Sequence, residues 1–179
     1  MKIIVIGDIA AGKTSLIRRH VEGNFTHNYK ATVGVDFFCK GEVQFWDIAG
    51  QERFGAMTRA FYQGAHAAMV VMDWSAEPSL RNAFRWVKDL RDKLPYPVPM
   101  VLVCNKCDLP SIYSLEDIDA QCKPLDMPWF SVSAKTGAGV AEAFCCIVRR
   151  GEEAAREGER EVRDGSVILV GEKKQHSCC

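Results

Sequence analysis

The stretch GDIAAGKTS, residues 7–15, has the residue types and spacing of a phosphate-binding loop. It fits the pattern G-x-x-x-x-G-K-[ST] and lies between an apolar strand-like run and a helical pattern. Its backbone N–H groups can face phosphate oxygens, and the following helix N-terminus adds positive potential. Lysine and threonine in this pattern bind the β- and γ-phosphates and Mg²⁺. A glycine-containing turn with a solvent-facing lysine is the competing interpretation. We expect the whole loop to bind a nucleotide: Gly7, Asp8, Ile9, Ala10, Ala11, Gly12, Lys13, Thr14 and Ser15.

A second stretch, CNKCD at residues 104–108, indicates which base is bound. Asp108 can accept from the ring N–H and the exocyclic amine of guanine, a pair of donors that adenine does not present. Asn105 is expected to brace this loop and Lys106 to lie along the base. The spacing of Cys104 and Cys107 also permits a redox or zinc site, although no second ligand pair lies nearby. In the later stretch SAK, the Ala134 N–H is expected to donate to the guanine carbonyl, which adds Ser133, Ala134 and Lys135 to the predicted nucleotide site.

Two further stretches have the residues needed to sense a γ-phosphate. In WDIAGQE, Asp47 can hold Mg²⁺ through water, the Gly50 N–H can reach the phosphate, and Gln51 can orient the attacking water. In YKATVG, Thr32 can ligate Mg²⁺ and meet the γ-phosphate through its N–H. We therefore predict Gln51, Lys13 and Thr32 as catalytic residues and Thr14, Thr32 and Asp47 as metal ligands. Phe25 can cover the guanine edge or pack in the core, and both interpretations stay open.

The surrounding sequence predicts the elements that position these loops. Apolar runs without alternation indicate strands buried on both faces, and amphipathic helical patterns lie between them. Alternation of this kind predicts an α/β sheet with helices on both sides and ligands at the carboxyl ends of its strands. The clearest strand runs are residues 3–6, 67–73, 100–104 and 129–132, and a helix is expected from Leu80 to Leu94.

The composition limits the possible functions. The 179 residues are 47% hydrophobic and carry 23 basic and 23 acidic side chains, so net charge gives no support for a nucleic-acid partner. No run approaches the length of a membrane span. A domain that folds in the cytosol is expected, with most of its eight cysteines reduced.

With these motifs in place, the chain resembles the Rab family of Ras-like small GTPases. VGVDFF, QFWDIAGQERF, RAFYQGA and VCNKCDL are similar to Rab signature stretches, and the likeness extends from Lys2 to Val148. WDIAG with MTRAFY resembles the subgroup that acts on late endosomal and lysosome-related organelles. The resemblance implies a P-loop G domain over residues 1–150, with a six-stranded, mostly parallel sheet, one antiparallel edge strand and helices on both faces.

The function that this resemblance implies is a switch in vesicle traffic. It would bind GTP or GDP with Mg²⁺, hydrolyse GTP slowly until an activating protein accelerates it, and recruit effectors in the GTP state. A nucleotide exchange factor, a GDP-dissociation inhibitor and a prenylation escort protein are the other implied partners. The alternative is a nucleotide-locked binding module, because Ile9 and Ala10 stand where many relatives have Ser or Gly, and because the hairpin between the switches is short.

Residues 151–179 read as a charged helix extension followed by a prenylated tail. Glu152 and Arg156 have the i,i+4 spacing of a solvated helix. The resemblance implies isoprenoids on Cys178 and Cys179, because two lipid chains hold a protein on a bilayer and one does not. This places the chain in the cytosol and on the cytoplasmic face of endomembranes. Free thiols, or metal binding together with His176, are the other interpretations.

The resemblance also implies an effector surface. Strands near residues 33–39 and 42–47 are expected to pair across a tight turn at Lys40-Gly41. Phe37, Trp46 and Tyr62 would then form the apolar triad that meets effectors, unless these aromatic side chains pack inward.

Overall fold

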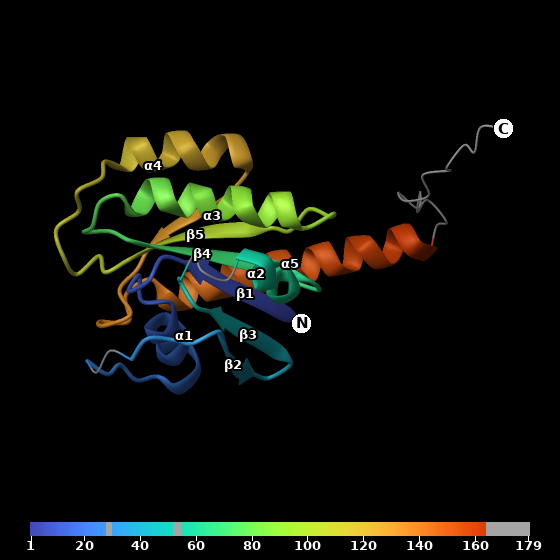
Figure 1. Cartoon of the computed structure of the whole chain (residues 1–179), viewed down its shortest axis with the longest axis horizontal. Helices are drawn as coiled ribbons and strands as arrows, with labels where there is room; N and C mark the ends of the chain where they lie inside the picture. The colour runs from blue at the N-terminus through green and yellow to red at the C-terminus, as the bar shows by residue number, and fades with distance from the viewer. Residues whose placement is uncertain (28–29, 52–54, 164–179) are drawn as a thin grey trace.

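The computed structural model describes residues 1–27, 30–51 and 55–163, and its central feature is one six-stranded sheet (Figure 1). The strand order is β2-β3-β1-β4-β5-β6, in which only the β2–β3 pair is antiparallel. This is the predicted fold. The strands are β1 (Lys2–Gly7), β2 (Val35–Lys40), β3 (Val43–Ile48), β4 (Ala67–Asp73), β5 (Met100–Asn105) and β6 (Trp129–Ser131).

Helices cover both faces of this sheet. Ile3 and Val5 on β1 belong to the core cluster beneath α1 and α5, whereas Ile4 and Ile6 belong to the cluster beneath α2, α3 and α4. Because successive strand residues point to opposite faces, a strand buried on both sides is apolar along its centre, as residues 3–6 of β1 are. The helices are α1 (Lys13–Glu22), α2 (Gly55–Tyr62), α3 (Ser79–Lys93), α4 (Leu115–Cys122) and α5 (Val140–Arg163).

The turn of the β2–β3 hairpin lies one residue later in the sequence than predicted. Lys40 pairs with Val43, so the two turn residues are Gly41 and Glu42 rather than Lys40 and Gly41. Gly41 has a φ of 58°, and glycine takes the first position of such a two-residue turn at low cost. The predicted turn is one residue too early. The sequence shows that the glycine belongs to the turn, but not whether it is the first or the second turn residue.

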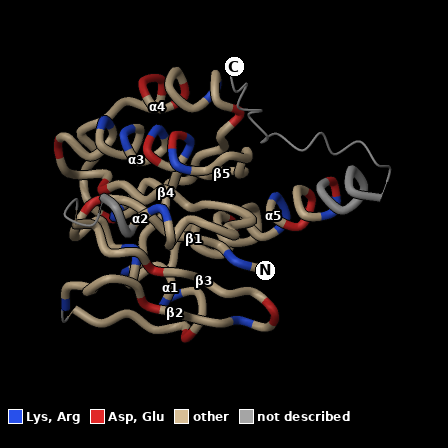
Figure 2. The backbone as a smooth tube through the Cα atoms, turned by 45° about the vertical axis from the view of Figure 1, so that its right-hand side comes forward, with Lys and Arg blue, Asp and Glu red and all other residues tan. Residues whose placement is uncertain are grey.

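Helix α5 crosses the predicted domain boundary at residue 150 without a break. Its C-terminal part extends past the sheet (Figure 1), and charges of both signs alternate along it (Figure 2). The Arg156 guanidinium lies 3.8 Å from the Glu152 carboxylate, which is the predicted i,i+4 pair. In the described part of the chain, no helix is long and apolar enough to cross a membrane. The predictions for Cys178, Cys179 and the tail concern residues outside the described ranges.

Candidate guanine-nucleotide site

The phosphate-binding motif forms the turn between β1 and α1. Lys13 is the first residue of α1, and its ammonium donates to the carbonyl oxygens of Gly7 at 2.9 Å and Asp8 at 2.8 Å. Burial lowers the pKa of Lys13 to about 8, although the carboxylates of Asp47 and Asp8 oppose this effect. The lysine is therefore held by the loop itself, with its cation at the floor of the turn.

Two glycines allow other segments to approach this turn closely. A Cβ atom on Gly12 would lie 2.3 Å from the Asn105 Nδ2 atom. A Cβ atom on Gly50 would lie 2.3 Å from the Ile9 backbone nitrogen. Both distances are far below contact distance, so any side chain at these positions would push the phosphate loop away from its neighbours.

The three predicted metal ligands meet at one point beside the loop. The Thr14 hydroxyl donates to Asp47 Oδ2 at 2.5 Å, and the Thr32 hydroxyl lies 3.1 Å from the same oxygen. The two hydroxyl oxygens are 3.0 Å apart. Asp47 is fully buried, which raises the pKa of its carboxyl. Its Oδ1 atom is buried and has no hydrogen-bond partner among the described residues, so it can accept from a ligand or water.

The opposite end of the site contains the CNKCD and SAK stretches. The Ser133 hydroxyl donates to Asp108 Oδ1 at 2.6 Å, and this bond keeps the pKa of Asp108 below its usual value. The Lys135 ammonium lies 3.8 Å from Asp108 Oδ2. Asn105 connects this end of the site to the phosphate loop, because its amide donates to the Ala11 carbonyl at 2.8 Å. The Ala134 N–H was predicted to meet the guanine carbonyl, but it donates to Asn105 Oδ1 at 3.1 Å.

A cavity of about 670 Å³ runs between these two ends. Phe25 lines this cavity and also packs against the core cluster of α1 and α5. It therefore has both a surface that can cover the guanine edge and a surface that packs in the core. The predicted residues that line the cavity are Ile9, Ala10, Gly12, Lys13, Thr14, Ser15, Phe25, Thr32, Gly50, Gln51, Asn105, Lys106, Asp108, Ala134 and Lys135.

Five predicted residues lie behind the cavity wall instead of lining it. Ala11, Asp47 and Ser133 are buried, and the Gly7 carbonyl accepts from Lys13. The Asp8 side chain turns away to α3, where it accepts from Asn82 Nδ2 at 2.7 Å and from Trp86 Nε1 at 2.9 Å. These five residues support the ones that face the cavity. A sequence motif does not distinguish the residues that line a site from those that support it.

Arg19 on α1 is a supporting residue that the sequence did not reveal. Its guanidinium donates to the carbonyl oxygens of Ala134 at 2.8 Å and Lys135 at 2.6 Å. A third bond of 2.9 Å reaches the Gly23 carbonyl at the end of α1. Arg19 therefore joins the helix of the phosphate loop to the SAK stretch. The only available signal was an arginine in a helix, which most often faces solvent.

The structure brings together two members of the predicted effector triad and buries the third. Phe37 and Trp46 are cross-strand partners whose rings meet edge to face with centroids 4.6 Å apart. Tyr62, however, is fully buried and donates its hydroxyl to Asp89 Oδ2 at 3.0 Å, so it does not belong to an exposed surface. The preceding residue, Phe61, is partly exposed and packs against the same core cluster as Trp46.

The zinc alternative for Cys104 and Cys107 gains no support. No cluster of three or more His, Cys, Asp or Glu residues suited to a metal occurs in the described ranges. Cys104 is fully buried in the sheet, and burial raises the pKa of its thiol.

A strand-loop-helix phosphate site, a carboxylate beside two hydroxyls and a base-reading aspartate define a P-loop domain for guanine nucleotides. The sequence matches the Ras family over residues 2–153. It is 41% identical to Ras-related protein Rab-32A of Dictyostelium discoideum, over 82% of this chain and 75% of the relative. It is 40% identical to Ras-related protein Rab-32 of Homo sapiens, over 83% and 73% of the two chains. It is 36% identical to Ras-related protein Rab-7L1 of Homo sapiens, over 99% and 96%.

The chain belongs to the Ras family, in its Rab branch and near the Rab-32 and Rab-7L1 proteins. It is a small GTPase, which binds guanine nucleotide and hydrolyses GTP.

Proposed function

We propose that this GTPase cycles between GDP and GTP states and recruits effectors to endomembranes in its GTP state. The observation that carries the proposal is the meeting of Thr14, Thr32 and Asp47. These residues come from the phosphate loop, the segment before β2 and the end of β3. A γ-phosphate at this point would contact all three segments, and its loss would release the two that are not part of the phosphate loop.

The residues of the cavity can bind the nucleotide along its whole length. Lys13 and the loop N–H groups face the phosphates, and Asp108 accepts from the guanine ring. The Asp108 carboxylate is held ionised by the Ser133 hydroxyl, which suits it to accept two hydrogen bonds. Gln51 lines the cavity beside Gly50, where its amide can orient the attacking water.

The residues present fit Mg²⁺. Two hydroxyls and one carboxylate are hard oxygen ligands, and the unpartnered Asp47 Oδ1 can accept from a metal-bound water. When bound there, Mg²⁺ would neutralise charge on the β- and γ-phosphates. Thr14 and Thr32 would supply the direct ligands, and Asp47 would orient the coordinating water and both hydroxyls.

A nucleotide-locked module remains the second candidate, because Ile9 lines the cavity with 55% of its surface exposed. The Ile9 backbone packs closely against Gly50, and its branched side chain faces the same cavity as Gln51, where it can restrict the attacking water. Single-turnover hydrolysis of bound GTP separates the two candidates. A switch should hydrolyse GTP at about 10⁻⁴ per second unaided, and Gln51→Leu should slow it further. No hydrolysis by the wild type would favour the locked module, whereas an unchanged rate in Gln51→Leu would mean that Gln51 does not orient the attacking water.

We also propose that Cys178 and Cys179 carry two isoprenoids, which would place the chain on late endosomal or lysosome-related membranes. Two chains are needed for stable anchoring because one gives only reversible binding. An escort protein would present the tail for modification, and a dissociation inhibitor would extract the lipidated GDP form. Intact-mass analysis of the protein from eukaryotic cells checks this. An unmodified chain in the membrane fraction would rule out the lipid anchor.

A further inference from the structure

Asp73 lies at the carboxyl end of β4, next to the base-reading loop but outside the cavity wall. The strand register pairs Asp73 with Asn105, and the Trp74 N–H donates to the Asn105 carbonyl at 2.8 Å. The ends of β4 and β5 therefore stand side by side, and the Asp73 carboxylate reaches the residue that follows Asn105.

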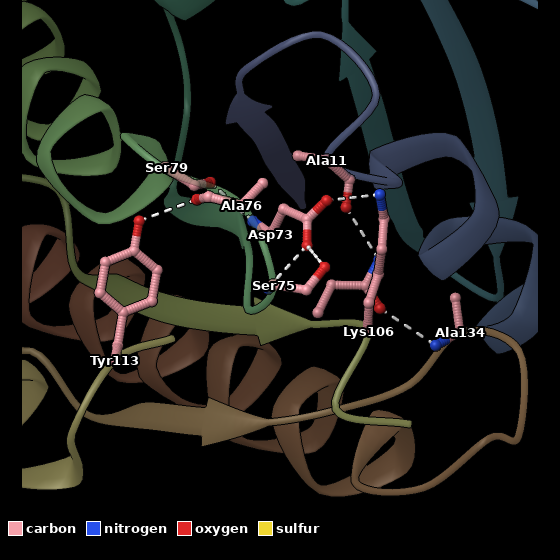
Figure 3. Close-up of polar contacts among 9 residues, drawn as sticks. Ala11, Asp73, Ser75, Ala76, Ser79, Lys106, Tyr113 and Ala134 are labelled. Atoms are coloured by element: carbon pink, nitrogen blue, oxygen red, sulfur yellow. Dashed lines mark hydrogen bonds and ion pairs between the residues drawn. The ribbon is translucent and has the colours of Figure 1, made fainter. Parts of the chain in front are cut away.

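Both oxygens of this carboxylate are occupied. Oδ2 accepts from the Lys106 ammonium at 2.5 Å, and Oδ1 accepts from the Ser75 N–H at 2.9 Å and the Ser75 hydroxyl at 2.8 Å (Figure 3). The Asp73 N–H donates to the Ser79 hydroxyl at 2.7 Å, which fixes the backbone that carries it. Burial alone would raise the pKa of Asp73, but Lys106 and Ser75 outweigh it and the pKa is lowered. The carboxylate is thus a fixed anion that holds one lysine.

A second carboxylate, that of Asp108, lies in the same loop as Lys106. Asp108 follows two residues later and already has one cation nearby, the Lys135 ammonium at 3.8 Å. An ammonium is attracted to any carboxylate that it can reach, and a second cation on Asp108 would occupy an oxygen needed by the base. Lys106 also has a φ of 69°, in the left-handed region that is uncommon for residues other than glycine. Its conformation therefore depends on contacts such as the one with Asp73.

We propose that Asp73 is a positioning residue of the nucleotide site, which holds the Lys106 ammonium away from Asp108 and keeps Asp108 available to guanine. Lys106 lines the cavity and Asp73 does not, so Asp73 acts through Lys106. The inference rests on the proposed role of Asp108 in reading the base.

The test compares GDP with IDP, which lacks the exocyclic amine that Asp108 accepts from. In Asp73→Asn, Lys106 is free to pair with Asp108, so release of fluorescent mant-GDP should become about tenfold faster. The preference for GDP over IDP in competition binding should fall by a similar factor. A purely structural role would weaken both nucleotides equally and leave that ratio unchanged.

Three further variants complete the experiment. Lys106→Met keeps the aliphatic stem without the ammonium, so adding Asp73→Asn to it should not change the ratio. Asp92→Asn removes an exposed carboxylate of α3 that pairs with Lys88, and serves as the matched control. Ser75→Ala leaves Asp73 in place but removes a hydroxyl donor. Ser75→Ala should also lower the preference for GDP over IDP, but by a smaller factor than Asp73→Asn. It therefore provides a test if Asp73→Asn does not fold.

The inference would be overturned if Asp73→Asn left the preference for GDP over IDP unchanged. It would also be overturned if Asp73→Asn lowered that preference equally in the wild type and in Lys106→Met. Asp108→Asn distinguishes this failure from failure of the proposed base recognition. If Asp108→Asn shifts the preference toward xanthine nucleotides while Asp73→Asn leaves the ratio unchanged, only the positioning role fails. If Asp108→Asn leaves the preference for guanine intact, the base assignment itself fails.

Discussion

Lys2, at the start of β1, is a buried cation with aromatic and carbonyl neighbours. Its ammonium lies 3.4 Å from the centroid of the Trp46 ring and donates to the Gln63 carbonyl at 2.7 Å. Only 9% of the residue is exposed. Burial lowers the pKa of Lys2 to about 8. A single side chain thus joins β1, the inner strand of the hairpin and the end of α2.

This lysine gives the stability of the protein a predictable pH dependence. In the unfolded chain its pKa is about 10.4. Between pH 8 and 10.4 the unfolded state binds a proton that the native state lacks, so the free energy of unfolding rises with pH. Relative to Lys2→Met, the wild type should gain on the order of 1 to 3 kcal/mol between pH 7.5 and 10.

Urea denaturation at saturating, constant GDP measures this difference, because a varying nucleotide occupancy would itself change stability. Lys123→Met, at an exposed position, should run parallel to the wild type. If the Lys2→Met curve is also parallel to the wild type, the charge of Lys2 does not change within this pH range.

At the scale of elements, the sequence predicts what is locally encoded. The runs of β1, β4 and β5 are apolar except at their ends, and such runs form the buried centre of a parallel sheet. The helix α3 begins after Pro78 and ends before Pro95, as its pattern predicts. The phosphate loop is also local, because its nine residues connect one strand to one helix.

The supporting contacts of the site could not be predicted in the same way. Asp8 is held by Trp86 on α3, Ala134 by Arg19 on α1, and Lys106 by Asp73. In each case the partner is an ordinary polar or aromatic residue far along the chain, and no periodicity or spacing marks it. These contacts depend on how the helices sit over the sheet, which the tertiary packing decides.

The error at Tyr62 has a related cause. Phe61 and Tyr62 are adjacent at the end of α2, a helix of only eight residues. Neighbouring residues of a helix lie about 100° apart, so only one of the two points to the centre of the buried face, while the other lies at its edge and stays partly exposed. In a short apolar helix the sequence does not show which of two adjacent residues faces the core. Here Tyr62 does, and its hydroxyl donates to Asp89.

Across the whole molecule, the hairpin connects the nucleotide site to an exposed apolar surface. Asp36 pairs with Asp47 across the two strands, and the next pair toward the turn is Phe37 with Trp46. Because side chains alternate along a strand, these two pairs point to opposite faces. Asp36 lines the cavity and Asp47 contacts Thr14 and Thr32, whereas Phe37 is 58% exposed. The nucleotide site and the aromatic pair are therefore back to back on the same strands.

We expect effectors to bind a surface formed by Phe37, Trp46 and Phe61, in place of the triad with Tyr62. Trp46→Ala should weaken capture of partners by the GTP-bound protein at least thirtyfold, about 2 kcal/mol, because buried aromatic anchors dominate interfaces. Affinity for GDP should stay within a few fold, since Trp46 does not line the cavity. Partner capture is measured from cell extract, on protein loaded either with a non-hydrolysable GTP analogue or with GDP. Titration with mant-GDP measures the nucleotide affinity.

Phe61→Ala and Tyr62→Phe test the corrected surface against the original one. Phe61→Ala should reduce GTP-dependent capture in the same way as Trp46→Ala. Tyr62→Phe should leave capture intact and lower the free energy of unfolding by about 1 kcal/mol, because it removes one buried hydrogen bond to Asp89. The opposite pattern, in which Tyr62→Phe loses partners and Phe61→Ala keeps them, would mean that α2 turns when GTP binds. If Trp46→Ala also abolishes nucleotide binding, the tryptophan holds the hairpin together and the proposed effector surface is wrong.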